Sequence, residues 1–461
     1  MTAGLGLRFE NKLARAQALT DAGWPEVTIQ LTPLPSRGIP MTSMPSRLSR
    51  ATRTAAVAGA SALVLSGCGG LASQSGTTSA DAAASCGDSV TIGAPYPFSG
   101  PFTEFGNNAY QGMDIAAKEI NDAGGIKALG GTKIKLAKGD TGSADPAQAS
   151  SAATKLIDGG AIALVGSWGS PQTNSASTVA EGARVPLVTQ SWSDQLSARD
   201  YQYYFQPPPK SSQMGGASSA YLTAAANSIG VKFTKVVGVG PNDTANVGQI
   251  TAAVKAFADA GAAAGEPDFY QAGLSDASPI VNRVAAQNPD LILTSGSPAD
   301  AVLIVKGLRE RGVTAPIMGF GGAFVAPSFA KNLGDTVNGL IAVTAWNDDL
   351  PLDGVEAATK SYRETYSEAF MPMEAGESWV NVHLVAEALE TSKSCDPEKI
   401  TEALRSLNVA KGPAAAMPGG QVSFSKDGTN PHAVPLLTQW QDRLPKTVWP
   451  EKYASSKLSL G

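Results

Sequence analysis

The sequence is poor in the residues that build most metal and catalytic centres. Its 461 residues include only two histidines, His383 and His432, and three cysteines. A metal site needs several such ligands close together, so we predict no metal ion and no other cofactor. No turn with the spacing of a nucleophile elbow is present, and neither histidine lies near a serine-bearing turn. We therefore expect that the protein is not an enzyme.

The chain also lacks an excess of positive charge. Charged residues make up 16% of it, and its formal net charge is −5. We find no basic patch interleaved with aromatic residues, so we predict no nucleic-acid partner. The hydrophobic content of 43% is that of an ordinary soluble globular body.

Long hydrophobic runs are missing as well. The apolar run Ala55–Leu65 follows arginines 47, 50 and 53 and is too short to span a bilayer. It ends in Leu-Ser-Gly before Cys68, which matches the lipobox of bacterial lipoproteins. We predict a signal peptide over residues 44–67 and lipidation of Cys68. The protein would then be extracytoplasmic, held by lipid at the outer face of the cell membrane.

The segments on either side of this signal peptide are interpreted from their composition. Residues 1–43 show no helical or strand period, and we interpret them as a mis-called extension, with Met41 or Met44 as the true start. Residues 68–88 are rich in Gly, Ser, Ala and Thr, which is typical of a flexible tether. The remaining cysteines, Cys86 and Cys395, are expected to form a disulfide in an oxidising compartment.

From Ser89 onward, apolar strands and helices alternate. This pattern predicts α/β architecture with doubly wound parallel sheets, and about 370 residues are enough for two lobes. Within it, the stretch "ALVGSWGSPQT" runs from a strand into a helix. We expect Ser170 to cap that helix and Pro171 to fill its first position. Such a helix start favours anions, although the stretch taken alone favours simple capping without a ligand.

Several motifs resemble one family. "TIGAPYPFSGPFTEFGNNAYQGMDIAAKEINDAGGI", "DTGSADPAQASSAATKLI" and "PDLILTSGSPADAVLIVKGLRERG" are similar to segments of type I periplasmic solute-binding proteins, in the Leu/Ile/Val-binding branch of ABC importers. The resemblance extends over about residues 89–449. It implies two Rossmann-like lobes, 89–205 with 345–428 and 206–344 with 429–461, joined by a three-stranded hinge.

The resemblance also implies a binding site between the lobes. Ser170 and Ser193 fall where the family holds a ligand carboxylate, with Ser191 supplying backbone groups. Phe105 replaces an aromatic residue that carries a hydroxyl in amino-acid binders. The family's acidic partner of the ligand ammonium falls on Gly321, which has no side chain, and this argues against a standard α-amino acid.

Other residues are candidates for the same site. Asp243 could supply the missing carboxylate or could be a turn residue. Trp168 and Trp192, beside the two serines, suggest an aromatic wall for a planar or apolar solute. Trp346 could join them or pack in the hinge.

These observations predict a monomeric solute-binding lipoprotein of an ABC importer. Its partners would be a small amino-acid-like, amide or organic-acid solute, the permease and ATPase subunits, and the membrane through the lipid anchor. A ligand sensor of the same fold, signalling to a membrane partner without transport, is the alternative.

Overall fold

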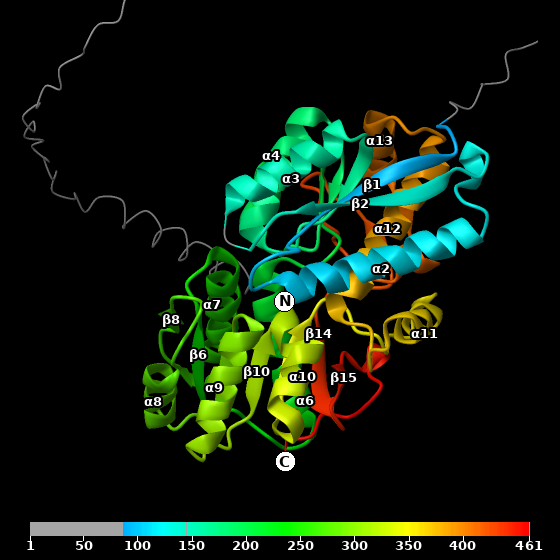
Figure 1. The fold of residues 1–461 in the computed structure, drawn as a ribbon. Coiled ribbons are helices and arrows are strands. Elements are labelled where there is room, and N and C mark those ends of the chain that lie inside the picture. The colour runs from blue at the N-terminus through cyan, green and yellow to red at the C-terminus, as the bar shows by residue number, and fades with distance from the viewer. Residues whose placement is uncertain (1–85, 144, 461) are drawn as a thin grey trace, which may run out of the picture. The chain divides into compact units, whose positions relative to one another are not determined.

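The computed structural model describes residues 86–143 and 145–460. The predicted extension, the signal peptide, Cys68 and the tether as far as residue 85 lie outside the described residues. Figure 1 shows how the described elements are arranged.

The first sheet is entirely parallel, with strand order β2-β1-β3-β4-β5. Its strands are β1 (Ser89–Tyr96), β2 (Lys133–Asp140), β3 (Ala161–Val165), β4 (Leu187–Val188) and β5 (Tyr204–Phe205). The connecting helices are α2 (Thr103–Asp122), α3 (Pro146–Asp158), α4 (Ser170–Ala183) and α5 (Asp194–Ser197). Residues 127–129 form a short 3-10 turn, η2 (Lys127–Leu129).

The faces of this sheet are covered by different helices. Ile92 and Tyr96 of β1 share a core with Met113 of α2, whereas Leu164 of β3 packs with Leu156 of α3 in a second core. Within β3, Ala163 and Val165 belong to the first core and Leu164 to the second, because successive residues of a strand point to opposite faces. Each face therefore needs its own apolar cover, which the strand–helix alternation in the sequence supplies.

The second sheet has the order β15-β14-β11-β10-β9-β6-β7, with β8 paired to β6. Its strands are β6 (Lys235–Pro241), β7 (Ala263–Ala264), β8 (Asp268–Tyr270), β9 (Leu291–Ser295), β10 (Ile317–Phe320), β11 (Ile341–Thr344), β14 (Leu436–Gln441) and β15 (Leu444–Trp449). Its helices are α6 (Ser211–Ser228), α7 (Thr244–Asp259), α8 (Ser278–Ala286), α9 (Pro298–Glu310) and α10 (Pro327–Leu333). The 3-10 turns η3 (Gly322–Val325) and η4 (Gly334–Val337) flank α10.

The predicted α/β class with parallel sheets is confirmed, with one difference. Strands β14 and β15 join the second sheet antiparallel to their neighbours. Two residues, Asp442 and Arg443, separate them, and both have positive φ. A two-residue hairpin of this kind joins antiparallel strands, whereas a parallel pair needs a long crossover.

Later helices return to the first sheet. The chain runs from β11 through α11 (Val355–Tyr366) to α12 (Met373–Ser392) and α13 (Pro397–Ser406). Helix α12 packs against α2 on one face of the first sheet, and Figure 1 shows the two helices side by side. The antiparallel pair β12 (Asn408–Val409) and β13 (Val422–Ser423) follows, with η5 (Pro413–Ala415) between its strands. The short turn η6 (Glu451–Tyr453) follows β15.

The strands of the two sheets fall on either side of the predicted lobe boundaries. At two of the predicted lobe boundaries, 205/206 and 428/429, Gln206 forms a parallel bridge with Thr429. The Gln206 N–H donates to the Gly428 carbonyl at 2.7 Å, and the Asn430 N–H donates to the Gln206 carbonyl at 3.0 Å. This pairing supports the lobe division, which stays a proposal. Within the described residues, no helix is both long and apolar enough to cross a membrane.

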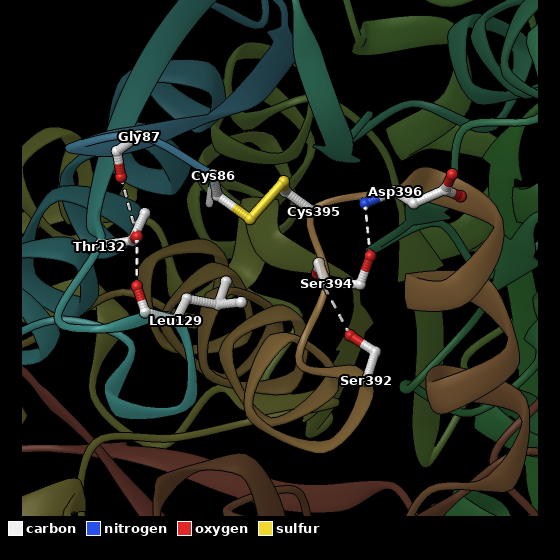
Figure 2. The surroundings of a disulfide bond; sticks show 8 residues. All are labelled: Cys86, Gly87, Leu129, Thr132, Ser392, Ser394, Cys395 and Asp396. Atoms are coloured by element: carbon white, nitrogen blue, oxygen red, sulfur yellow. Dashed lines mark hydrogen bonds between the residues drawn. A yellow bond between two sulfur atoms is a disulfide. The ribbon is translucent and has the colours of Figure 1, made fainter. Parts of the chain in front are cut away.

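Cys86 and Cys395 are joined by a disulfide, the pairing expected from the sequence, with Cα atoms 5.8 Å apart. Figure 2 shows that the bond links the segment before β1 to the loop between α12 and α13. Thr132 donates to the carbonyls of Gly87 and Leu129 on one side, and Ser394 accepts from the Asp396 N–H on the other. The disulfide thus ties the start of the first sheet to helices 309 residues further on.

Candidate functional site

The helix that follows β3 begins one residue away from the predicted position. Helix α4 starts at Ser170 and its N-cap residue is Gly169, so Ser170 is the first helical residue and Pro171 the second. The prediction that Ser170 caps the helix is wrong, because no side chain caps α4 and Gly169 has the extended backbone of a cap residue. The Ser170 residue is half-buried, and its hydroxyl makes no hydrogen bond with any of the described residues. It is therefore available to a ligand.

The serines of the next turn differ from one another. Ser191 is buried, and its hydroxyl is held by Thr173 at 2.5 Å and by the carbonyls of Ser167 and Trp168. Its backbone N–H donates to the Thr189 hydroxyl at 3.0 Å. Ser193 is the N-cap residue of α5, yet its side chain makes no cap bond. Ser193 thus keeps a free hydroxyl, whereas both polar groups that Ser191 would offer a ligand are already engaged.

Aromatic side chains gather beside these turns. Phe105 of α2 is fully buried and stacks on Trp168, with ring centroids 4.1 Å apart and planes 13° from parallel. Phe102 packs against Trp168 at 5.1 Å. Trp192 lies against the turn after β10, where a Cβ on Gly321 would be 3.6 Å from its ring. The structure therefore places Trp168, Trp192 and Gly321 near the ends of strands from both sheets.

Two of the predicted ligand-binding residues have structural roles instead. The Asp243 carboxylate caps α7 by accepting from the N–H groups of Ala245 and Asn246 at 3.1 Å, and it also accepts from the Asn246 side chain. It is a capping residue and not the free carboxylate that a ligand ammonium would need. Trp346 is fully buried and donates to the Ala416 carbonyl at 3.0 Å, so it packs in the core.

The first turns of α12 carry two residues that the sequence analysis missed. Glu374 and Glu377 are 0% and 1% exposed, and none of their four carboxylate oxygens has a hydrogen-bond partner among the described residues. Residues three apart lie on the same face of a helix. Burial raises the pKa of Glu374 to about 7. Burial, with the nearby charge of Glu374, raises the pKa of Glu377 as well.

The two indoles approach these carboxyl groups. Trp168 partly lowers the pKa of Glu374, and Trp192 partly lowers the pKa of Glu377. The Trp192 Nε1 nonetheless makes no hydrogen bond of acceptable geometry. The carboxyl groups and the aromatic wall therefore belong to one site.

Further buried polar atoms around α12 have no partner. The Gln190 amide nitrogen donates to the Glu374 carbonyl at 2.6 Å and to the Ser378 hydroxyl at 2.7 Å, which leaves Gln190 Oε1 unpaired. The Asn381 amide donates to the Thr189 carbonyl, and its Oδ1 is unpaired. The Ser167 hydroxyl is unpaired too. Unpaired buried polar groups are costly, and a group of them at one place is typical of a site for a ligand or water.

Elements of both sheets meet at this cluster. A Cβ on Gly322 would come within 1.8 Å of Glu374 Oε1, so the turn after β10 lies directly against that carboxyl group and a side chain there would displace it. Nearby, Glu104 of α2 accepts hydrogen bonds from the backbone N–H of Ser328 at 3.0 Å and from its hydroxyl. Ser328 lies in the first turn of α10. The two sheets are thus linked beside the site by groups that a hinge motion would separate.

A surface hollow lies elsewhere. It is lined by charged and polar side chains of α4, α13 and the segment before β5, including Glu181, Arg184, Glu398 and Arg405. None of the predicted ligand residues lines it. Among the described residues, no group of three or more His, Cys, Asp or Glu side chains could hold a metal ion.

Two doubly wound lobes with an unpaired polar cluster where they meet define the architecture of a two-lobed binding protein. The model of the periplasmic binding protein family matches residues 89–443, and the chain belongs to that family. The chain is 27% identical over 392 residues to Leu/Ile/Val-binding protein homolog 8 of Brucella melitensis, a match that covers 80% of this chain and 92% of the relative.

Solved structures show the same fold. The substrate-binding protein LivJ of Streptococcus pneumoniae, in complex with isoleucine, superposes with a TM-score of 0.65 at 23% identity, covering 78% of this chain and all of that one. A solute-binding protein of R. palustris in complex with benzoate gives a TM-score of 0.66 at 18% identity, covering 80% and 98%. The type I periplasmic binding protein fold predicted from the sequence is therefore confirmed.

Proposed function

We propose that this protein is the extracytoplasmic solute-binding lipoprotein of an ABC importer, and that it captures a small amino-acid-like, amide or organic-acid solute between its lobes. The main support for this proposal is the cluster of buried, unpaired polar atoms around Glu374, Glu377 and Gln190. A solute that supplies their missing partners would repay the cost of burying them.

Membership of the periplasmic binding protein family supports this role. Structural neighbours hold ligands as different as isoleucine and benzoate, so the family fold alone does not select the solute. Binding needs no chemical step, and release to a permease needs only that the lobes reopen. The lipid anchor at Cys68 is part of the proposal, because it would keep the protein beside the permease.

A solute screen tests the binding role. The full-length protein is heated with amino acids, amides, urea and aromatic acids in turn, and hits are measured by calorimetry. We expect a one-to-one complex with at least one class, and a rise in Tm that grows with solute concentration. If no class raises the Tm, the proposed binding role is contradicted.

Membrane fractionation tests the anchor. Cys68→Ala should release the protein from the membrane fraction and leave solute affinity unchanged, since Cys68 lies outside both lobes in sequence. A variant that stays in the membrane fraction after signal cleavage would show that Cys68 is not the anchor. Uptake of the solute by membranes containing the permease and ATPase separates import from signalling.

A further inference from the structure

We infer that the solute carries a cationic nitrogen group, an ammonium or a guanidinium, and that Glu374 and Glu377 of α12 bind it. This inference rests on the proposed binding function and narrows its solute class. It assigns the counter-charge to the first turns of α12 and not to the turn after β10, where the resemblance places it.

Acceptors outnumber donors among the unpaired buried atoms of the cluster. When both glutamates are ionised, six of these atoms are acceptors only: the four carboxylate oxygens, Gln190 Oε1 and Asn381 Oδ1. Trp192 Nε1 can only donate, and the Ser167 hydroxyl can donate or accept. Among the described residues, no lysine, arginine or histidine forms an ion pair with either glutamate. A group rich in N–H donors and carrying positive charge is the complement of such a surface.

The charge and the burial of the two glutamates also favour a cationic solute. Both glutamates are fully buried, and the groups that act on Glu374 include a third carboxylate, Glu104. Tyr96 of β1 also faces the pair, and its own pKa is raised by burial and by both glutamates. No basic group acts on either carboxyl. An anionic solute without a cationic group would add charge of the sign already in excess, which is unfavourable in a buried site.

The turn after β10 meets the carboxyl groups with glycine, and two indoles lie beside them. Gly321 faces Trp192 and Gly322 faces Glu374, so at these two positions the second lobe presents backbone and no side chain. Trp168 and Trp192 lie beside Glu374 and Glu377 respectively. Indole rings can attract organic cations through their faces, and Phe105 covers one face of Trp168, so Trp192 and the other face of Trp168 are compatible with the same solute class.

The test is a calorimetric panel of named probes on the full-length protein. Agmatine and putrescine are cations, leucine is a zwitterion, acetamide is neutral and benzoate is an anion. We expect agmatine or putrescine to bind more tightly than leucine, and benzoate not to bind. Cation affinity should rise as pH rises from 5 to 7, because the glutamates must be ionised to pair with it.

Isosteric variants assign the effect to the pair. Glu374→Gln and Glu377→Gln should each weaken cation binding about ten- to hundred-fold. Glu387→Gln, an exposed position on the same helix, is the matched control and should leave affinity unchanged. Because each variant removes a buried carboxyl that is costly to ionise, the empty protein at pH 7 should melt at the same temperature or higher, which excludes misfolding as the cause.

The outcomes separate the two proposals. Binding of benzoate or acetamide with an affinity that neither glutamine variant changes would overturn this inference and leave the binding function standing. A protein that binds cations with unchanged affinity in both variants would also overturn it. Absence of binding to every probe here and in the solute screen would instead contradict the binding function itself.

Discussion

Ser170 and Ser191 lie on neighbouring turns but differ in what their hydroxyl groups do. The Ser191 hydroxyl contacts Thr173 and two carbonyls, whereas the Ser170 hydroxyl has no partner in the part of the chain that the structure describes. A free hydroxyl at the start of α4, beside backbone N–H groups of the first helical turn, is suited to a solute oxygen. The two residues therefore offer a matched pair of substitutions.

Ser170→Ala should weaken binding of a solute that carries a carboxylate or amide oxygen by about ten- to hundred-fold. Its Tm should hardly change, because the hydroxyl caps nothing. Ser191→Ala should instead lower the Tm, since it leaves buried partners unpaired. Calorimetry and thermal unfolding of both variants check this. A Ser170→Ala protein with full affinity and a lowered Tm would show a structural role.

The buried glutamates also predict how stability depends on pH. The pKa of Glu374 is raised to about 7, and that of Glu377 is raised as well. Between pH 4.5 and 7 the folded protein therefore holds protons that the unfolded chain has released. The free energy of unfolding of the empty protein should fall as pH rises through this window, and no such penalty exists below it.

Urea unfolding at pH 4.5, 5.5 and 7 measures this slope. Asp348, whose buried carboxyl has a pKa raised to about 6, adds an effect of the same sign. The comparison is therefore with the Glu374→Gln, Glu377→Gln double variant, which should show a shallower slope than the natural protein. Equal slopes would mean that the two glutamates do not titrate as buried groups.

At the scale of elements, α2 and α10 are joined across the lobes. Glu104 of α2 receives both hydrogen bonds that Ser328 of α10 can donate. Hydrogen bonds to a charged acceptor stabilise more than neutral ones. Because the bonds connect helices of different sheets, they should favour the conformation in which the lobes are together.

Glu104→Ala should weaken solute affinity by about ten-fold, mainly through faster dissociation, and should change the Tm little. Lys118→Ala is the control on the same helix, because its pair with Asp122 is exposed and within α2. Stopped-flow dissociation and calorimetry give the two quantities. An unchanged dissociation rate would show that the contact does not hold the lobes together.

The disulfide acts on elements that are far apart in sequence. Cys86 precedes β1, and Cys395 follows α12. Replacing both by serine should cost on the order of 4 kcal/mol of stability through the freed loop, without loss of solute binding. Denaturant unfolding of the double variant and mass spectrometry of the exported protein check this. Two free thiols in the exported protein would contradict the bond.

The elements show what the sequence could predict. The alternation of strands and helices predicted the fold class because each βα unit buries its own apolar side chains. The cap of α4 was misplaced by one residue, since Gly169 has no side chain to signal its role. Asp243 could have been recognised as a cap from the helix that follows it directly.

Glu374 and Glu377 were missed for a different reason. They belong to a helix whose neighbours in space, Gln190 and Gly322, are far away in sequence. The available signal was two acidic residues three apart among the small and apolar residues that begin α12, which is unusual because glutamate is rarely buried without a partner. Contacts between the lobes join residues that are far apart in sequence, and the local spacing of apolar residues does not predict such contacts.

For the whole molecule, the central claim is that one small solute binds at the polar cluster between the lobes. The most direct measurement is a crystal structure of the full-length protein grown with the tightest-binding probe. We predict density for one molecule beside Trp168 and Trp192, with a nitrogen about 3 Å from a carboxylate oxygen of Glu374 or Glu377. Density for the solute only in another place, with water filling the cluster, would contradict the account.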